Sequence, residues 1–205
     1  MDSLQKLKNN QRRIGLTGGI ATGKSTITNY IRKHKNIPIL DADDLSRELI
    51  KPNTYGYKKI LNYFGNQIID NKNNKEEKIN RKLLRKIIFK NSESKKWIEK
   101  LLHPLIKEKM IEKCSQYKDN ETIVMVIPLL FEANFEDICT EIWLVKCPYE
   151  IQKKRLITRD KISEKEAYEI INFQLSFEEK KNFSDIILDN SDDQNKWINK
   201  IKDLL

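Results

Sequence analysis

Cysteine and histidine are scarce in this chain. Its 205 residues include three cysteines and two histidines. Cys114, Cys139 and Cys147 are odd in number and lack metal-ligand spacing, and neither His34 nor His103 has a partner at such spacing. These residues therefore form no recognisable metal motif, and we expect reduced thiols in a cytoplasmic protein.

Long hydrophobic runs are also missing. No stretch approaches the roughly 18 apolar residues that a membrane-spanning helix needs. The first 13 residues carry basic side chains and no apolar core, so they do not resemble a secretory signal. We expect no membrane association, and a flexible tail over residues 1–12.

Acidic residues are outnumbered by basic ones. The 39 lysines and arginines exceed the 30 aspartates and glutamates, which gives a net charge of +9. Such an excess can serve nucleic-acid binding or attract a polyanionic small substrate. Because the chain is rich in lysine, asparagine and isoleucine throughout, we attribute the charge to lysines spread over solvated faces. We therefore expect no nucleic-acid partner.

One glycine-rich stretch organises the rest of the chain. Residues 18–25 read GGIATGKS and match the phosphate-loop pattern G-x-x-x-x-G-K-S. They follow a short apolar run at 14–17 and precede a helical stretch at 25–35, which is the strand–loop–helix context that the pattern requires. The alternative is a glycine turn that merely links a strand to a helix.

The chemistry of phosphate binding explains the spacing in this loop. Glycines let successive backbone N–H groups turn toward one anion, and the following helix points its positive end at the same anion. Lys24 would reach the β- and γ-phosphate oxygens of ATP, and Ser25 would offer a hydroxyl to Mg²⁺. Ala21 stands where glycine is commoner, an exchange that a negative φ would allow. The candidate nucleotide-binding residues of the loop are Gly18, Gly19, Ile20, Ala21, Thr22, Gly23, Lys24, Ser25 and Thr26.

The order of apolar runs predicts an α/β fold. Five short runs at 14–17, 37–40, 123–127, 142–145 and 186–188 alternate with helical patterns, which is typical of a five-stranded parallel sheet in a three-layer sandwich. Residues of about 52–120 contain helical stripes and no strand, so they read as a helical insertion. Pro104 interrupts one stripe and predicts a kink or a new helix start. Ser163 and Glu166 predict a capping box.

Two aspartates follow the second predicted strand, in the sequence Asp41-Ala42-Asp43. Since parallel strands end at the same edge of a sheet, both carboxylates would approach the γ-phosphate if strand 37–40 neighbours strand 14–17. Asp41 could then serve Mg²⁺, and Asp43 could take a proton from an attacking hydroxyl. A pair of helix-capping acids is the alternative. The motifs D-x-x-G and N-K-x-D are absent, which disfavours a GTPase.

Basic side chains form two further candidate groups. Arg155 and Arg159 stand four residues apart and share a helix face, from which they could close over transferring phosphates. A solvated helix face is the alternative. In the insertion, Arg81 begins a basic cluster that could face either a cleft or water.

Together these motifs resemble those of the dephospho-coenzyme A kinases, a family of the nucleoside-kinase-like P-loop group. The resemblance covers about residues 12–204. It rests on the following segments: Leu16 to Thr26, Asp41-Ala42-Asp43 with Arg47, Leu101 to Leu105, Val126 to Glu132, Gln152 with Lys154-Arg155, Arg159-Asp160, and Gln174.

The resemblance implies that ATP phosphorylates the ribose 3′-hydroxyl of dephospho-CoA to give CoA and ADP, the last step of CoA synthesis. Within a kinase domain at 13–205, it implies a P-loop core at 13–51, 121–147 and 184–205 and a helical lid at about 148–182. We also expect a monomer or weak homo-oligomer. The implied site residues are Asp43 as general base, Lys24, Arg155 and Arg159 on the phosphates, Thr17, Arg81, His103 and Glu132 on the substrate side, and Asn190 near the adenine.

The resemblance leaves two other functions to be compared. One is a different small-molecule P-loop kinase, which would phosphorylate a nucleoside or nucleotide. The other is a basic P-loop protein that binds nucleic acid and has no phosphoryl acceptor. The aspartate pair disfavours the second, because binding alone does not need it. A panel of acceptors separates the first from a dephospho-CoA kinase.

Overall fold

The computed structural model describes residues 4, 7, 10–70, 77–118, 121–191 and 193–205. Most of the expected tail, residues 71–76 and 119–120, and Asp192 lie outside these residues. The chain divides into two compact units. One consists of residues 1–41 and 113–205 and contains the sheet, and the other is the helical unit Ala42–Glu112.

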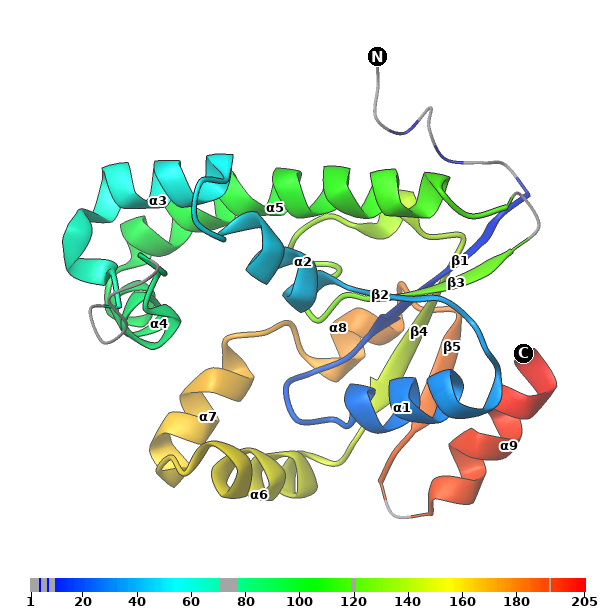
Figure 1. Ribbon diagram of the computed structural model, residues 1–205. Helices are drawn as coiled ribbons and strands as arrows, with labels where there is room; N and C mark the ends of the chain where they lie inside the picture. The colour runs from blue at the N-terminus through cyan, green and yellow to red at the C-terminus, as the bar shows by residue number, and fades with distance from the viewer. Residues whose placement is uncertain (1–3, 5–6, 8–9, 71–76, 119–120, 192) are drawn as a thin grey trace. The chain divides into compact units, whose positions relative to one another are not determined.

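A five-stranded parallel sheet forms the centre of the first unit (Figure 1). The expected parallel α/β sheet is thus confirmed. Its strands stand in the order β2-β3-β1-β4-β5. Their bounds are β1 Arg12–Thr17, β2 Ile39–Asp41, β3 Thr122–Val126, β4 Glu141–Lys146 and β5 Ile186–Asp189.

The strand order corrects one step of the sequence argument. β2 pairs with β3 and not with β1, so strand 37–40 is no neighbour of the strand that leads into the phosphate loop. In the register, Asp41 pairs with Val126 and Val126 pairs with Leu16. Asp41 is therefore level with Leu16 but two strands away, at roughly 10 Å between backbones. Sequence alone gives no strand order, because every buried parallel strand has the same apolar pattern.

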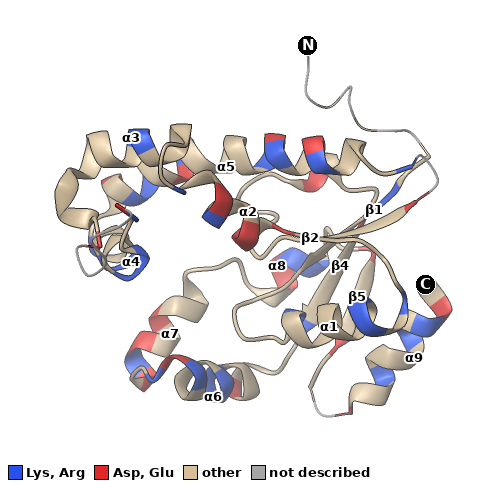
Figure 2. Cartoon of the chain, viewed as in Figure 1, with Lys and Arg blue, Asp and Glu red and all other residues tan. Residues whose placement is uncertain are grey.

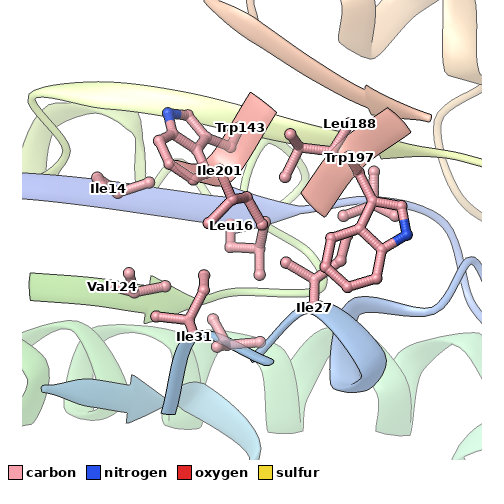
Figure 3. Close-up of a cluster of buried hydrophobic side chains, with 11 residues drawn as sticks. Ile14, Leu16, Ile27, Ile31, Val124, Trp143, Leu188, Trp197 and Ile201 are labelled. Atoms are coloured by element: carbon pink, nitrogen blue, oxygen red, sulfur yellow. The ribbon is translucent and has the colours of Figure 1, made fainter. Parts of the chain in front are cut away.

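Two helices cover one face of the sheet. Helix α1 (Lys24–His34) contributes Ile27 and Ile31, and helix α9 (Gln194–Leu204) contributes Trp197 and Ile201 (Figure 3). These side chains pack against sheet residues that include Ile14 and have exposures of 4% or less. This cluster fixes the start of α1, and therefore the helix end that follows the phosphate loop, against the sheet.

The opposite face of the sheet is covered by the segment that follows β3. A Cβ atom on Gly15 would lie 2.6 Å from Cys139 Sγ and 2.7 Å from a Leu130 methyl group. The side chain of Arg13 ties the same segment to β1, because its Nε donates to the Ile138 carbonyl at 2.9 Å. The loop after β3, with its short helix η3 (Glu136–Ile138), therefore packs directly on β1.

Three helices occupy the stretch that the sequence predicts as a lid. They are α6 (Tyr149–Asp160), α7 (Glu164–Asn172) and α8 (Phe177–Lys181). The expected capping box at Ser163 and Glu166 is confirmed at the start of α7. A second one, formed by Ser176 and Glu179, begins α8. The same S-x-x-E pattern is visible in the sequence, so α8 could have been predicted by the rule that found α7.

The helical unit contains α2 (Ala42–Leu49), α3 (Tyr55–Phe64), η2 (Asn66–Ile68), α4 (Arg81–Lys90) and most of α5 (Ser92–Ser115). Its own core includes Tyr57, Ile60 and Ile68. Helix α5 continues through Pro104, so of the two alternatives predicted there the new helix start is wrong and the kink stays a prediction. Apolar side chains on both sides of the proline are buried, and this packing outweighs the one backbone hydrogen bond that proline removes. None of the described helices is long and apolar enough to cross a membrane.

None of the three cysteines forms a disulfide with another described residue. Burial raises the pKa of Cys114 to about 11 and that of Cys139 to about 12, because the low-dielectric surroundings disfavour the thiolate. Cys147 is half-buried, and Nη1 of Arg155 lies 3.4 Å from its sulfur.

These surroundings predict selective labelling of the folded protein by iodoacetamide. At pH 8 only Cys147 should react quickly, since the thiolate is the nucleophile and the other two thiols stay protonated. Mass spectrometry of tryptic peptides measures the extent of labelling at each site. Unfolding in denaturant should make all three equally reactive, and equal labelling without denaturant would contradict the burial described here.

Candidate active site

The phosphate loop connects β1 to α1 in a backbone conformation that most side chains disfavour. Gly18 and Gly23 have φ values of 149° and 99°, and Ala21 has a φ of 58°. The negative φ that would make Ala21 an unstrained replacement for glycine is therefore not found. Left-handed backbone brings the Cβ of an L-residue close to its own carbonyl oxygen, which costs roughly 1–2 kcal/mol.

We expect Ala21→Gly to raise the free energy of unfolding by about 0.5–1 kcal/mol, because relief of the left-handed strain exceeds the extra entropy of glycine in the unfolded chain. Thermal unfolding followed by circular dichroism measures the change. Ala133→Gly is the matched control, since Ala133 is not among the residues with positive φ. Equal destabilisation by both substitutions would show that Ala21 carries no strain.

Gly18 and Gly23 are also needed because neighbouring atoms leave no room for a Cβ atom at either position. A Cβ atom on Gly18 would lie 2.8 Å from the Val145 carbonyl oxygen, and one on Gly23 would lie 1.9 Å from Nδ2 of Asn190. Among the described residues, the backbone N–H groups of Ala21 and Gly23 donate to no acceptor. Unpaired amides in a tight loop at a helix N-terminus are suited to binding an anion.

Lys24, the first residue of α1, folds back over the loop. Its Nζ donates to the carbonyl oxygens of Gly18 at 2.7 Å and Gly19 at 2.9 Å. The ammonium group is thus held beside the unpaired loop amides, where it can add a positive charge to an anion site. Ser25 and Thr26 are exposed in the first turn of the same helix.

Asn190 supports the phosphate loop from the end of β5. Its Nδ2 donates to the Thr22 carbonyl at 2.8 Å, and its Oδ1 accepts from Trp197 Nε1 at 3.1 Å. The residue is 5% exposed. Arg155 of α6 donates to the Asn190 carbonyl at 3.3 Å. The structure therefore brings Asn190 and Arg155 together behind the loop, a contact that no sequence signal revealed.

Arg159 lies one turn further along α6, whose basic residues outnumber its two acidic ones, Glu150 and Asp160, near the ends of the helix (Figure 2). Its side chain is 56% exposed and bonded to Asp160, an interaction that raises the pKa of Arg159. Arg155 and Arg159 are both on α6, as expected. Within the described parts of the chain, Arg155 is the one of the two that is bonded to residues beside the loop.

The side chains of Glu132 and Thr17 bond to other groups of the protein. Oε1 of Glu132 lies 2.8 Å from Nζ of Lys180 and accepts from the Leu175 amide at 3.1 Å. Lys180 is 1% exposed, and this carboxylate compensates its buried charge. Thr17 is fully buried, and its hydroxyl donates to the Pro128 carbonyl at 3.4 Å.

The other predicted residues belong to the helical unit. Asp43 is exposed in the first turn of α2, which begins at Ala42, so Asp43 lies inside the helix and is not its N-cap. Arg81 is the exposed first residue of α4. His103 of α5 is half-buried. Burial lowers its pKa, an effect that Glu99 opposes.

Two glutamines hold the loop although composition and spacing give them no role. Nε2 of Gln152 donates to the Ile20 carbonyl at 2.7 Å, and Oε1 of Gln174 accepts from the Ile20 amide at 2.7 Å. Both were among the motif residues of the family resemblance, which was the one available signal. In the part of the chain that the structure describes, no cluster of three or more metal-ligating side chains is found.

Known proteins resemble the chain over nearly its whole length. A protein named dephospho-CoA kinase from Prochlorococcus marinus (strain MIT 9312) is 85% identical over 205 residues, which is 100% of each chain. The solved dephospho-CoA kinase from Campylobacter jejuni is 29% identical, with a TM-score of 0.67 and coverage of 95% of this chain and 97% of that one. The solved protein TT1252 from Thermus thermophilus is 24% identical and shares the fold, with a TM-score of 0.78 and coverage of 96% and 97%. The family model described as dephospho-CoA kinase matches residues 12–196, and the chain therefore belongs to the dephospho-CoA kinase family.

Proposed function

We propose that this protein transfers the γ-phosphate of ATP to the ribose 3′-hydroxyl of dephospho-CoA, giving CoA and ADP in the last step of CoA synthesis. Membership of the dephospho-CoA kinase family is the observation that carries the proposal. The phosphate loop supports it, because two amides without an acceptor among the described residues, a lysine ammonium group and the start of a helix come within the four consecutive residues 21–24.

The donor phosphates would bind to the loop from Gly18 to Thr26. The amides of Ala21 and Gly23 would donate to phosphate oxygens. The Lys24 ammonium group would leave the carbonyls of Gly18 and Gly19 and bind the β- and γ-phosphates instead. Phosphoryl transfer needs little covalent chemistry from a protein, so charge neutralisation and positioning account for most of the rate.

Mg²⁺ would accompany ATP. The exposed hydroxyl of Ser25 and the carboxylate of Asp41 supply oxygen donors, which this ion prefers. Mg²⁺ retains several waters and is held largely by substrate phosphates, so one or two protein ligands are sufficient. Its chemical contribution is to offset the charge of the β- and γ-phosphates.

Asp43 would act as the general base. The ribose 3′-oxygen attacks the γ-phosphorus, the bond from that phosphorus to the oxygen that bridges it to the β-phosphorus breaks, and the 3′-hydroxyl proton passes to the Asp43 carboxylate. Asp43 is exposed and follows Asp41 by two residues, which keeps the two Cα atoms within about 7 Å of each other.

The remaining site residues would bind substrates. Arg155 and Arg159 would neutralise charge on the transferring phosphate, and Asn190, which is hydrogen-bonded to the loop, would lie near the adenine. His103, kept neutral by burial, can donate a hydrogen bond to the substrate. The proposed substrate-side residues are Thr17, Asp43, Arg81, His103 and Glu132. We also propose that the protein works in the cytoplasm, as a monomer or weak homo-oligomer.

A coupled assay of ADP release tests the proposed function. With ATP and Mg²⁺ present, release should depend on dephospho-CoA, and nucleosides and nucleoside monophosphates should give little. Transfer to a nucleotide but none to dephospho-CoA would favour the alternative of another small-molecule kinase. Chelation of Mg²⁺ by EDTA should abolish turnover, and activity that survives chelation would reject the proposed Mg²⁺ requirement.

A further inference from the structure

The backbone of Ile20 is held on both sides by side chains that are distant in sequence. Gln152, in the first turns of α6, donates to its carbonyl oxygen, and Gln174, which follows α7, accepts from its amide. Both bonds measure 2.7 Å, and Gln152 is 8% exposed. Two glutamines at the two ends of the α6–α7 stretch therefore form hydrogen bonds to the backbone of one residue of the phosphate loop.

The hydrogen bond from Gln152 orients an N–H group that can donate to an anion. The Ile20 carbonyl and the Ala21 amide belong to one planar peptide unit, in which C=O and N–H point in opposite directions. A hydrogen bond from Gln152 to the carbonyl therefore fixes the direction of the Ala21 N–H, which has no acceptor among the described residues. Without this bond the peptide unit could rotate, since Ala21 is already in an unfavourable left-handed conformation.

The hydrogen bond to Gln174 orients the preceding peptide unit, between Gly19 and Ile20. Its N–H is that of Ile20, and its carbonyl oxygen, on Gly19, accepts from Lys24 Nζ at 2.9 Å and from the Thr22 hydroxyl at 2.9 Å. This peptide unit thus links Gln174 on one side to the phosphate-binding lysine on the other. Displacement of Gln174 would loosen the carbonyl that holds Lys24 in place.

Gln174 is itself anchored through its neighbour. The Leu175 amide donates to Glu132 at 3.1 Å, and the same carboxylate oxygen lies 2.8 Å from the buried Nζ of Lys180. Replacing a buried ion pair by apolar side chains often leaves a protein equally stable. The Glu132–Lys180 pair therefore does more than stabilise the fold, because it fixes the backbone of Leu175, the residue next to Gln174.

We infer that Gln152 and Gln174 are positioning residues for the donor nucleotide, which hold two successive peptide units of the loop in the orientation that binds phosphate. Through them, nucleotide affinity depends on the position of the α6–α7 stretch. The inference rests on the proposed function only in taking ATP as the ligand of the loop. It predicts a change in nucleotide affinity and none in affinity for the acceptor.

The test measures the dissociation constants of ATP and dephospho-CoA separately by calorimetry, for the full chain and its variants. Gln174→Met and Gln152→Met conserve side-chain volume and remove the hydrogen bonds. Each should weaken ATP binding about threefold to tenfold, the worth of one hydrogen bond, and leave the dephospho-CoA constant unchanged. Gln194→Met, on the exposed start of α9, is the matched control and should change neither constant.

A conservative variant separates positioning from a general structural effect. Gln174→Glu retains the acceptor for the Ile20 amide and adds a negative charge that repels phosphate. Its defect relative to the unaltered protein should shrink as salt is raised, because salt screens the repulsion, whereas the defect of Gln174→Met should persist. Unfolding midpoints of these variants should match that of the control.

ATP dissociation constants within twofold of the unaltered protein for both methionine variants would overturn the inference. So would equal weakening of ATP and dephospho-CoA binding, which would indicate general damage. Because nucleotide affinity is measured without an acceptor, failure of dephospho-CoA to be phosphorylated would reject the proposed function and leave this result standing.

Discussion

Asp43→Asn is expected to lower kcat for dephospho-CoA phosphorylation by about 10²–10⁴-fold, the usual contribution of a general base. The amide is nearly the same size as the carboxylate and cannot take the 3′-hydroxyl proton. Since ATP binds to the phosphate loop, KM for ATP should change little. The coupled ADP assay at saturating substrates measures kcat.

Asp44→Asn is the matched control for this experiment. Asp44 is the next residue in the first turn of α2, and its carboxylate is bonded to Arg47 on the surface. The control tests whether loss of negative charge near the helix N-terminus has any effect by itself. Its kcat should stay within about twofold of the unaltered protein, because Asp44 has no proposed part in proton transfer and its exposed ion pair with Arg47 adds little to stability. A normal kcat for Asp43→Asn would remove Asp43 from the mechanism.

Lys24→Met is expected to lower kcat by about 10²–10³-fold, comparable to the loss of one preorganised group that stabilises charge in a transition state. Methionine retains most of the aliphatic length and has no charge for the phosphates. The substitution also removes two hydrogen bonds to the carbonyls of Gly18 and Gly19, so KM for ATP should rise as well.

Lys33→Met provides the control for the lysine substitution. Lys33 is exposed in the last turn of α1, so the same change in charge and side chain occurs on the same helix. Its kinetic constants should match those of the unaltered protein. If Lys24→Met and Lys33→Met behaved alike, the ammonium group of Lys24 would have no direct part in phosphoryl transfer.

Local patterns in the sequence predicted the elements that depend on local chemistry. Apolar runs located all five strands of the sheet, because strands buried on both faces need continuous apolar sequence. The side chains of Ser163 and Glu166 predicted the start of α7, since both partners of a capping box lie within one turn. The phosphate loop was recognised for the same reason, as its glycines and lysine are consecutive in the chain.

Features that depend on distant contacts were not predictable in this way. The position of β3 between β2 and β1 has no local signal, so the expected pairing of strand 37–40 with strand 14–17 was wrong. The positive φ of Ala21 has no local signal either, and the residue before it is hydrogen-bonded by Gln152 and Gln174, more than 130 residues further along the chain. The family resemblance included both glutamines, but their hydrogen bonds to the Ile20 backbone became visible only in the structure.

The proposed function is phosphoryl transfer from ATP to one hydroxyl group, and ³¹P NMR of the reaction products observes that transfer directly. Incubation of the protein with ATP, Mg²⁺ and dephospho-CoA should produce a phosphomonoester signal coupled to the proton on the 3′-carbon of the ribose, together with the signals of ADP. A phosphomonoester at another position, or none with dephospho-CoA while a nucleotide acceptor is phosphorylated, would contradict it.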